Sequence, residues 1–115
     1  MVRVAIPIFR SRISPVFDSC TRVLLVDIEH NREMERSEIY LDELSLTERL
    51  SILQKSRVAI VICGGISDLL QNMLQSVKIS LIAGIAGEVE QVVTAYLSER
   101  LDEPQFHMPG YKDEH

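Results

Sequence analysis

The chain has 115 residues, of which 46% are hydrophobic and 25% charged, and its formal net charge is −5. This size and composition predict one soluble globular domain, and the acidic balance argues against a surface that tracks nucleic-acid phosphates. No apolar run reaches the roughly 18 residues that a membrane-spanning helix needs, and the N-terminus shows no signal-peptide pattern. Two cysteines are too few for a disulfide scaffold, so we expect a cytoplasmic protein with no membrane partner.

Three strands are expected in the first 41 residues. Residues 2–8 form an apolar run that is typical of a strand buried on both faces, and a polar loop follows over residues 10–19. Residues 21–29 are rich in β-branched and apolar side chains, and residues 33–41 alternate more weakly, with charges on one side. A turn signal at residues 30–32 predicts that these two strands form an antiparallel hairpin.

Helices and strands alternate in the rest of the chain. Ser45 and Glu48 have the spacing of a capping box, which predicts a helix that ends near Lys55. Two short apolar runs read as strands, and two further stretches have apolar residues at helical spacing. The expected strands cover residues 58–62 and 79–83, and the expected helices cover residues 67–76 and 88–97.

The order β-β-β-α-β-α-β-α predicts an α/β fold with a mixed five-stranded sheet. Right-handed crossovers make the last two strands parallel to each other. The simplest arrangement has the strand order 3-2-1-4-5 with helices on both faces, which is a ribonuclease-H-like three-layer fold. We expect one domain over residues 1–101 and a loosely ordered C-terminal tail over residues 102–115, which contains two prolines and a glycine.

A binding site is expected at the carboxyl ends of the parallel strands, where ligands of open α/β sheets bind. Three loops would converge there, over residues 9–20, 63–67 and 84–87. Cys63 ends a strand, Gly64 and Gly65 allow close approach of the backbone, and Ser67 begins a helix whose N-terminus favours anions. The antiparallel second strand would start at the same edge and bring Cys20 close to Cys63.

Charge and sulfur together predict an anion pocket with one or two thiol ligands. Arg10, Arg12 and Arg22 outnumber the single acid of this edge, Asp18. Structural explanations stay open, because a strand-end cysteine often belongs to the core, a Gly-Gly pair often forms a tight turn, and loop arginines are often solvated. No cysteine pair has zinc-ligand spacing, and the three loops contain no histidine for a nucleophile–histidine–acid set. The first strand has no acid, so a two-metal nuclease site is not expected.

Several short motifs, in order, resemble the dinitrogenase iron-molybdenum cofactor biosynthesis family. They are ISPVFD at residues 13–18, VLLVD at 23–27, CGGI at 63–66, GIAGEVE at 84–90 and AYL at 95–97. The resemblance covers about residues 1–101. It implies a ribonuclease-H-like fold, and characterised members bind anionic iron–sulfur or iron–molybdenum precursor clusters and pass them on. The family often has the loop sequence SPHFG, so Val16 stands here in place of a histidine and Asp18 in place of a glycine. A tail folded over the edge would bring His107 there instead.

The leading hypothesis is a small non-enzymatic binding protein that holds an iron–sulfur-type or iron–molybdenum-type cluster at this edge. By resemblance, Cys63 would be the metal ligand and Cys20 the second ligand, while Arg10 and Arg12 would compensate the charge of the cluster. The backbone of Gly64, Gly65, Ile66 and Ser67 would donate hydrogen bonds, and cluster donor and acceptor proteins would be the partners. The alternative is an interaction or regulatory module that kept the fold and lost the cluster. A third hypothesis is an enzyme that binds a small anion at the helix N-termini.

Overall fold

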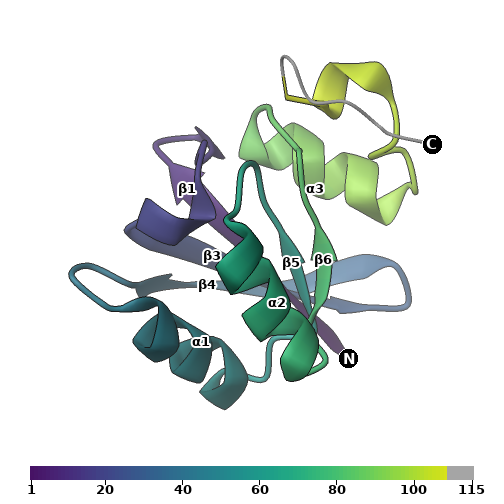
Figure 1. Ribbon diagram of the computed structural model, residues 1–115. Coiled ribbons are helices and arrows are strands. Elements are labelled where there is room, and N and C mark those ends of the chain that lie inside the picture. Colours follow the sequence, from purple (N-terminus) through teal and green to yellow (C-terminus); the bar gives the residue numbers. More distant parts are fainter. Residues whose placement is uncertain (109–115) are drawn as a thin grey trace.

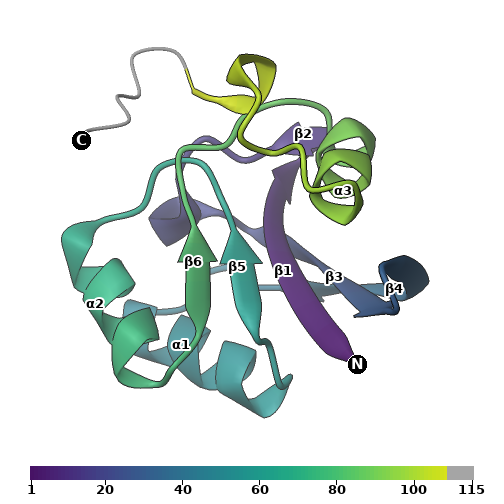
Figure 2. The same ribbon diagram turned by 90° about the vertical axis from the view of Figure 1, so that its right-hand side faces the viewer.

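The computed structural model of the chain describes residues 1–108. Its sheet has the order β4-β3-β1-β5-β6, which confirms the predicted order of the five main strands. β1 is antiparallel to β3 and parallel to β5, and β5 is parallel to β6 (Figure 2). The bounds are β1 (Val2–Phe9), β3 (Arg22–Glu29), β4 (Arg32–Tyr40), β5 (Ile60–Ile62) and β6 (Ser80–Ile82). The ribonuclease-H-like label stays a prediction.

The prediction of a five-stranded sheet is wrong, because a sixth strand lies in the expected loop over residues 10–19. This strand, β2 (Arg12–Ile13), folds back on the end of β1 and pairs Ile8 with Ile13. The reversal takes Arg10 to a φ of 58°, and the pairing buries Ile13. A single-turn 3₁₀ helix, η1 (Phe17–Ser19), follows and buries Phe17. A two-residue strand has no periodicity, which is why the pattern did not predict it.

Three α-helices cover the two faces of the sheet (Figure 1). α1 (Leu46–Lys55) and α2 (Asp68–Ser76) lie on one face, and α3 (Val89–Leu97) lies on the other. The capping box is confirmed, since the backbone N–H of Glu48 donates to Ser45 Oγ at 3.1 Å and that of Ser45 donates to Glu48 Oε1 at 2.9 Å.

The sheet separates two hydrophobic clusters, and β1 contributes to both. Val4 and Ile6 belong to the cluster under α3, whereas Ala5 belongs to the cluster under α1 and α2. Successive side chains of a strand point to opposite faces, so a central strand of a three-layer fold must be apolar throughout. This explains why residues 2–8 read as a continuous apolar run.

Residues 102–108 of the expected tail fold against the rest of the chain. Pro104 begins a second 3₁₀ turn, η2 (Pro104–Phe106), and the side chain of Phe106 is only 7% exposed in the cluster under α3. Leu101 is buried in the same cluster. The rest of the expected tail, residues 109–115, lies outside the described residues.

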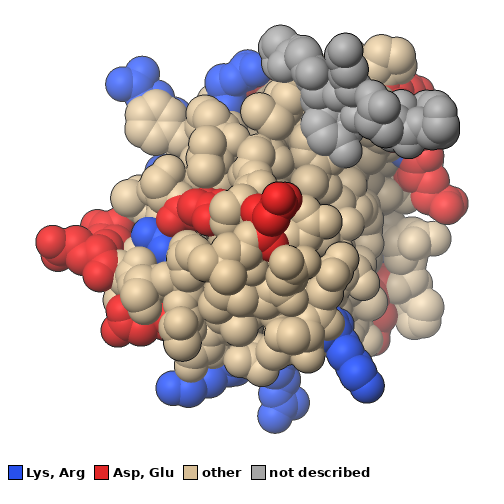
Figure 3. Space-filling model, viewed as in Figure 1, with Lys and Arg blue, Asp and Glu red and all other residues tan. Residues whose placement is uncertain are grey.

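Charges on the face shown in Figure 3 are mixed. Acidic side chains lie across its middle and left, and basic side chains lie mostly along its upper and lower rims. That face therefore has no continuous basic surface of the kind that nucleic-acid binding requires. Within residues 1–108, no helix is long and apolar enough to cross a membrane.

Replacing Phe106 tests whether the tail is part of the core. Phe106→Ala removes a buried aromatic side chain, so we expect the free energy of unfolding to fall by about 3 kcal/mol. Gln105→Ala is the matched control, because Gln105 is an exposed residue of the same turn, and it should change stability by less than about 0.5 kcal/mol. Urea unfolding measures both, and equal stabilities of the two variants would show that the tail does not pack as described.

Candidate functional site

The three loops expected to converge do lie together at one end of the sheet. We call residues 9–20, 63–67 and 84–87 the loop edge. Val16 forms a parallel β-bridge with Gly65, and the N–H of Gly84 donates to the carbonyl oxygen of Gly64 at 2.9 Å. These backbone bonds hold the middle loop between the other two, above the ends of β1, β5 and β6 (Figure 2).

The two glycines are explained by the close approach of the neighbouring loop. A Cβ on Gly64 would lie 2.9 Å from the carbonyl oxygen of Pro15, and one on Gly65 would lie 3.1 Å from the same oxygen. The N–H of Gly65 donates to Pro15 at 2.7 Å, and its carbonyl oxygen accepts from Phe17 at 2.8 Å. These glycines therefore serve loop packing, and the N–H of Gly65 is not available to a ligand.

Both thiols are buried in the cluster under α1 and α2. Cys63 is 0% exposed and Cys20 is 4% exposed. Burial raises the pKa of Cys63 to about 12 and that of Cys20 to about 11, because an apolar environment disfavours the thiolate. Ile66 packs against the same cluster. Both thiols are thus protonated at neutral pH and shielded from a ligand outside.

Arg49 is a buried cation beside Cys20 that the sequence analysis missed. Its guanidinium donates to the carbonyl oxygens of Cys20 at 2.5 Å and Leu44 at 3.1 Å, and Nη1 lies 3.8 Å from Cys20 Sγ. The positive charge lowers the pKa of Cys20, but burial outweighs it. A helical wheel could have found this residue, since Arg49 is three residues after Leu46 and four before Leu53, on the apolar face of α1.

The N-terminus of α2 is already occupied by a carboxylate of the chain itself. Asp18 Oδ1 accepts from the N–H of Ser67 at 2.8 Å, and its Oδ2 accepts from the hydroxyl of Ser67. Ser67 Oγ in turn accepts from the N–H of Leu70 at 3.1 Å. Because a helix N-terminus favours one nearby negative charge, Asp18 takes the place that the sequence analysis assigned to an external anion.

The three arginines expected at this edge contact other side chains of the chain. The guanidinium of Arg10 lies 5.4 Å from the centroid of the Phe9 ring. Arg12 pairs with Glu88 at 3.1 Å, and Arg22 pairs with Glu38 at 3.0 Å. At the start of α3 the N–H of Val89 donates to the carbonyl oxygen of Ser11 at 2.8 Å. The first N–H of α3 is therefore used by the chain itself.

The described part of the tail covers the loop edge. His107 forms an antiparallel bridge with Ile85, and the N–H of Ala86 donates to the carbonyl oxygen of Phe106 at 2.7 Å. A Cβ on Gly64 would lie 3.3 Å from Met108 Sδ. The tail brings His107 to this edge and places the Met108 side chain against Gly64.

These donors do not fit an iron–sulfur or iron–molybdenum cluster in the described conformation. Such clusters are held mainly by thiolates, and both thiols are protonated and buried. Within residues 1–108, no three His, Cys, Asp or Glu side chains are grouped so that they could hold a metal ion. Ligation by Cys63 would require the cluster under α1 and α2 to open around the thiol.

Exposed apolar side chains gather at this end of the molecule. Phe9 and Val16 belong to the loop edge, Leu69 lies in the first turn of α2, and Tyr40 pairs with Arg22 where β3 begins. These are four of the seven large hydrophobic residues that are exposed among residues 1–108. Such a concentration is typical of an interaction surface.

Replacing Asp18 tests its role as an internal anion. Asp18→Ala removes two hydrogen bonds from Ser67, so we expect the free energy of unfolding to fall by about 1 kcal/mol. Asp68→Asn is the matched control, since Asp68 is the acid in the first turn of the same helix. Its effect should be no more than about half as large. Equal losses in denaturant titrations would contradict the capping role.

The burial of the thiols predicts slow alkylation. At neutral pH we expect iodoacetamide to modify Cys20 and Cys63 only after denaturant unfolds the chain, which mass spectrometry of the intact protein measures. Folding raises both pKa values above that of an unfolded cysteine, about 8.5, so above this pH the folded chain keeps thiol protons that the unfolded chain has lost. The free energy of unfolding should therefore fall between about pH 8.5 and 12, and less steeply in a Cys20→Ala/Cys63→Ala variant. Rapid labelling of the folded chain would contradict this.

Comparison with known proteins gives the fold and the family. The structure of PH0822 is similar with a TM-score of 0.82 and 22% identity, over 86% of this chain and 91% of that chain. A “putative dinitrogenase” of Methanocaldococcus jannaschii is similar with a TM-score of 0.71 and 26% identity, over 85% of this chain and 89% of that chain. A “putative NifB protein” of Thermotoga is similar with a TM-score of 0.66 and 18% identity, over 100% of this chain and 99% of that chain. No curated protein matches the sequence significantly. The model of the dinitrogenase iron-molybdenum cofactor family matches residues 1–99. The chain therefore belongs to the dinitrogenase iron-molybdenum cofactor family.

Proposed function

We propose that this protein is a non-enzymatic interaction module of the dinitrogenase iron-molybdenum cofactor family, and that it binds a partner protein through the apolar side chains at the loop edge. The observation that carries the proposal is the gathering of Phe9, Val16, Tyr40 and Leu69 at the end of the sheet where the ligand sites are closed. In this function the loop edge is a contact surface and Cys63 is a core residue.

The interior of the loop edge supports this choice over a resident cluster. Asp18 accepts from the N–H of Ser67 at the start of α2, Arg12 is paired with Glu88, and both cysteines are buried in the cluster under α1 and α2. A surface in which charges are satisfied internally and apolar groups are exposed suits a protein partner better than an anion. Aromatic residues such as Phe9 and Tyr40 are common anchors of such contacts.

A second candidate is a carrier that takes up an iron–sulfur-type cluster as cargo and passes it between donor and acceptor proteins. The family match supports it, because the matched residues 1–99 include Cys63 and all three loops. This function needs a conformation in which the cluster under α1 and α2 opens, since the side chains of that cluster bury the thiol of Cys63.

Loading the protein with iron and sulfide under anaerobic conditions separates the two candidates. We expect the wild-type protein to show no thiolate-to-iron charge-transfer absorption after desalting, and elemental analysis to find substoichiometric iron, because the thiols are inaccessible. A Val16→His/Asp18→Gly variant restores the loop residues that are common in the family and serves as the comparison. Absorption bands that appear in the wild type and disappear in Cys63→Ser would overturn the proposal in favour of the carrier.

Partner capture tests the contact surface itself. A protein recovered from the native cells by the wild-type chain should be lost with Phe9→Glu, because a carboxylate in the centre of an apolar contact is costly to desolvate. Met34→Glu is the matched control, since Met34 is 56% exposed, close to the 59% of Phe9, but lies on β4 at the opposite end of the sheet. Loss of the partner with both variants, or with neither, would contradict binding through the loop edge.

A further inference from the structure

One side of the outer strand β6 faces no other strand among residues 1–108. The N–H of Ser80 donates to Ala59 and the carbonyl oxygen of Ile82 accepts from Cys63, so both residues turn their backbone groups toward β5. Because successive residues of a strand alternate in direction, the N–H and carbonyl of Leu81 face the open side. An edge of this kind can pair with a further strand.

The other outer strand, β4, is protected against such pairing. Five of its nine residues are charged, and an irregularity interrupts its pairing with β3 between Asp27 and Ile28. Charges and bulges are common means of keeping an edge strand from pairing with another chain. β6, by contrast, consists of Ser80, Leu81 and Ile82 and has no charge. The edge that is suited to pairing is therefore that of β6.

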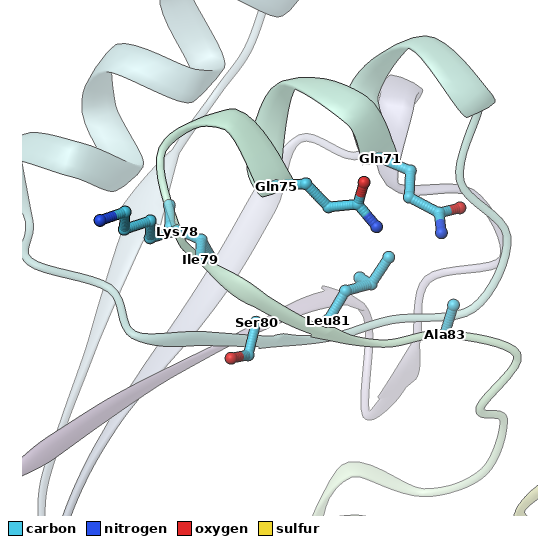
Figure 4. A pocket seen from close by; sticks show the side chains of 7 residues that line it. All are labelled: Gln71, Gln75, Lys78, Ile79, Ser80, Leu81 and Ala83. Carbon is cyan, nitrogen blue, oxygen red and sulfur yellow. The ribbon is translucent and has the colours of Figure 1, made fainter.

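A groove of about 690 Å³ runs along the open side of β6, between this strand and α2. Gln71 and Gln75 extend from α2 toward the strand, and Leu81 points up toward these amides (Figure 4). The helix and the strand run in opposite directions, so Lys78 lies at one end of the groove, while Gln71 and Ala83 lie at the other. Leu81 thus marks the middle of the groove.

The two ends of this face carry opposite charges. Asp68 lies three residues before Gln71 and seven before Gln75, a spacing that places all three on one side of α2. Asp68 therefore extends this side of the helix beyond Gln71, away from Lys78. Asp68 and Lys78 are both exposed, and neither forms a salt bridge within the described part of the chain. Both charges are available to a partner.

Such a face is complementary to itself when a second copy is related to it by a two-fold axis. An axis through Leu81 places the Lys78 end of each groove against the Asp68 end of the other. Along the strand, Lys78 is three residues from Leu81, or about 10 Å. Along the helix, Asp68 is five residues from the midpoint of Gln71 and Gln75, or about 7.5 Å. The two charges therefore lie at similar distances from the axis, and the long lysine side chain can span the difference.

We propose that β6 pairs in antiparallel direction with β6 of a second copy, so that the protein forms a two-fold symmetric dimer with one continuous sheet. Each Leu81 N–H donates to the carbonyl oxygen of the other Leu81, and each Lys78 pairs with Asp68 of the second copy. Gln71 of one copy lies opposite Gln75 of the other, where the two amides exchange hydrogen bonds. A second copy fits better than another occupant, because one face supplies both the cation and the acid. This inference does not depend on the function proposed above.

Reversing the charges one at a time tests the dimer by sedimentation velocity of the full-length protein. Between about 10 μM and about 1 mM, a range that suits a small interface, we expect the wild type to pass from monomer to dimer. Lys78→Glu and Asp68→Lys should each raise the dissociation constant at least about tenfold, because like charges then face each other. An equimolar mixture of the two variants should associate about as strongly as the wild type, since every mixed dimer has two pairs of opposite charge. Lys55→Glu is the matched control, because Lys55 is an exposed lysine at the end of α1 and should leave association unchanged.

Amide hydrogen exchange then locates the contact. The N–H of Leu81 should exchange at least about tenfold more slowly at the high concentration than at the low one, because it gains a hydrogen-bond partner in the dimer. Exchange of Leu81 that is independent of concentration would overturn the proposal, whether the edge is free or is covered by another part of the same chain. So would a wild type that stays monomeric, or a mixture of the two charge variants that associates no better than either variant alone.

Discussion

The loop edge depends on the close approach of the backbone at residues 14–16 to Gly64 and Gly65. The Pro15 carbonyl oxygen accepts the Gly65 N–H, leaves no room for a Cβ on Gly64 and would be in tight contact with one on Gly65. This contact holds residues 14–16 against the two glycines, and Asp18 follows at the start of α2. A side chain at position 64 would push the two loops apart, since real Cβ atoms are not found at such distances from a carbonyl oxygen.

A consequence is that the groups usually recruited for anion binding are used inside the protein. The helix N-terminus of α2 binds Asp18, the start of α3 is held by Ser11 and Arg12, and Arg49 donates to the backbone of Cys20. Each of these contacts replaces a ligand contact by an intramolecular one. The family fold is retained with a closed loop edge, and the apolar side chains around that edge are exposed at the surface.

Much of the fold could be predicted from the sequence because its signals are local. The capping box of Ser45 and Glu48, the hairpin signal at residues 30–32 and the alternation of apolar runs each depend on a few neighbouring residues. They were sufficient to predict the strand order. The strand β2 was missed because two residues have no period, and the packing of Phe106 was missed because two prolines and a glycine around it favoured a loose tail.

The candidate site, like the fold, could be predicted from the sequence only in part. The sequence by itself determined which residues meet at the loop edge, because strand order and crossover handedness place the ends of β1, β5 and β6 together. Only the tertiary structure decided what those residues do there. Burial of a thiol, pairing of Arg12 with Glu88 and capping of Ser67 by Asp18 join residues that are 49 or more positions apart, or depend on the whole core. Such contacts leave no local pattern, because the free energy of burial and of ion pairing is set by neighbours in space.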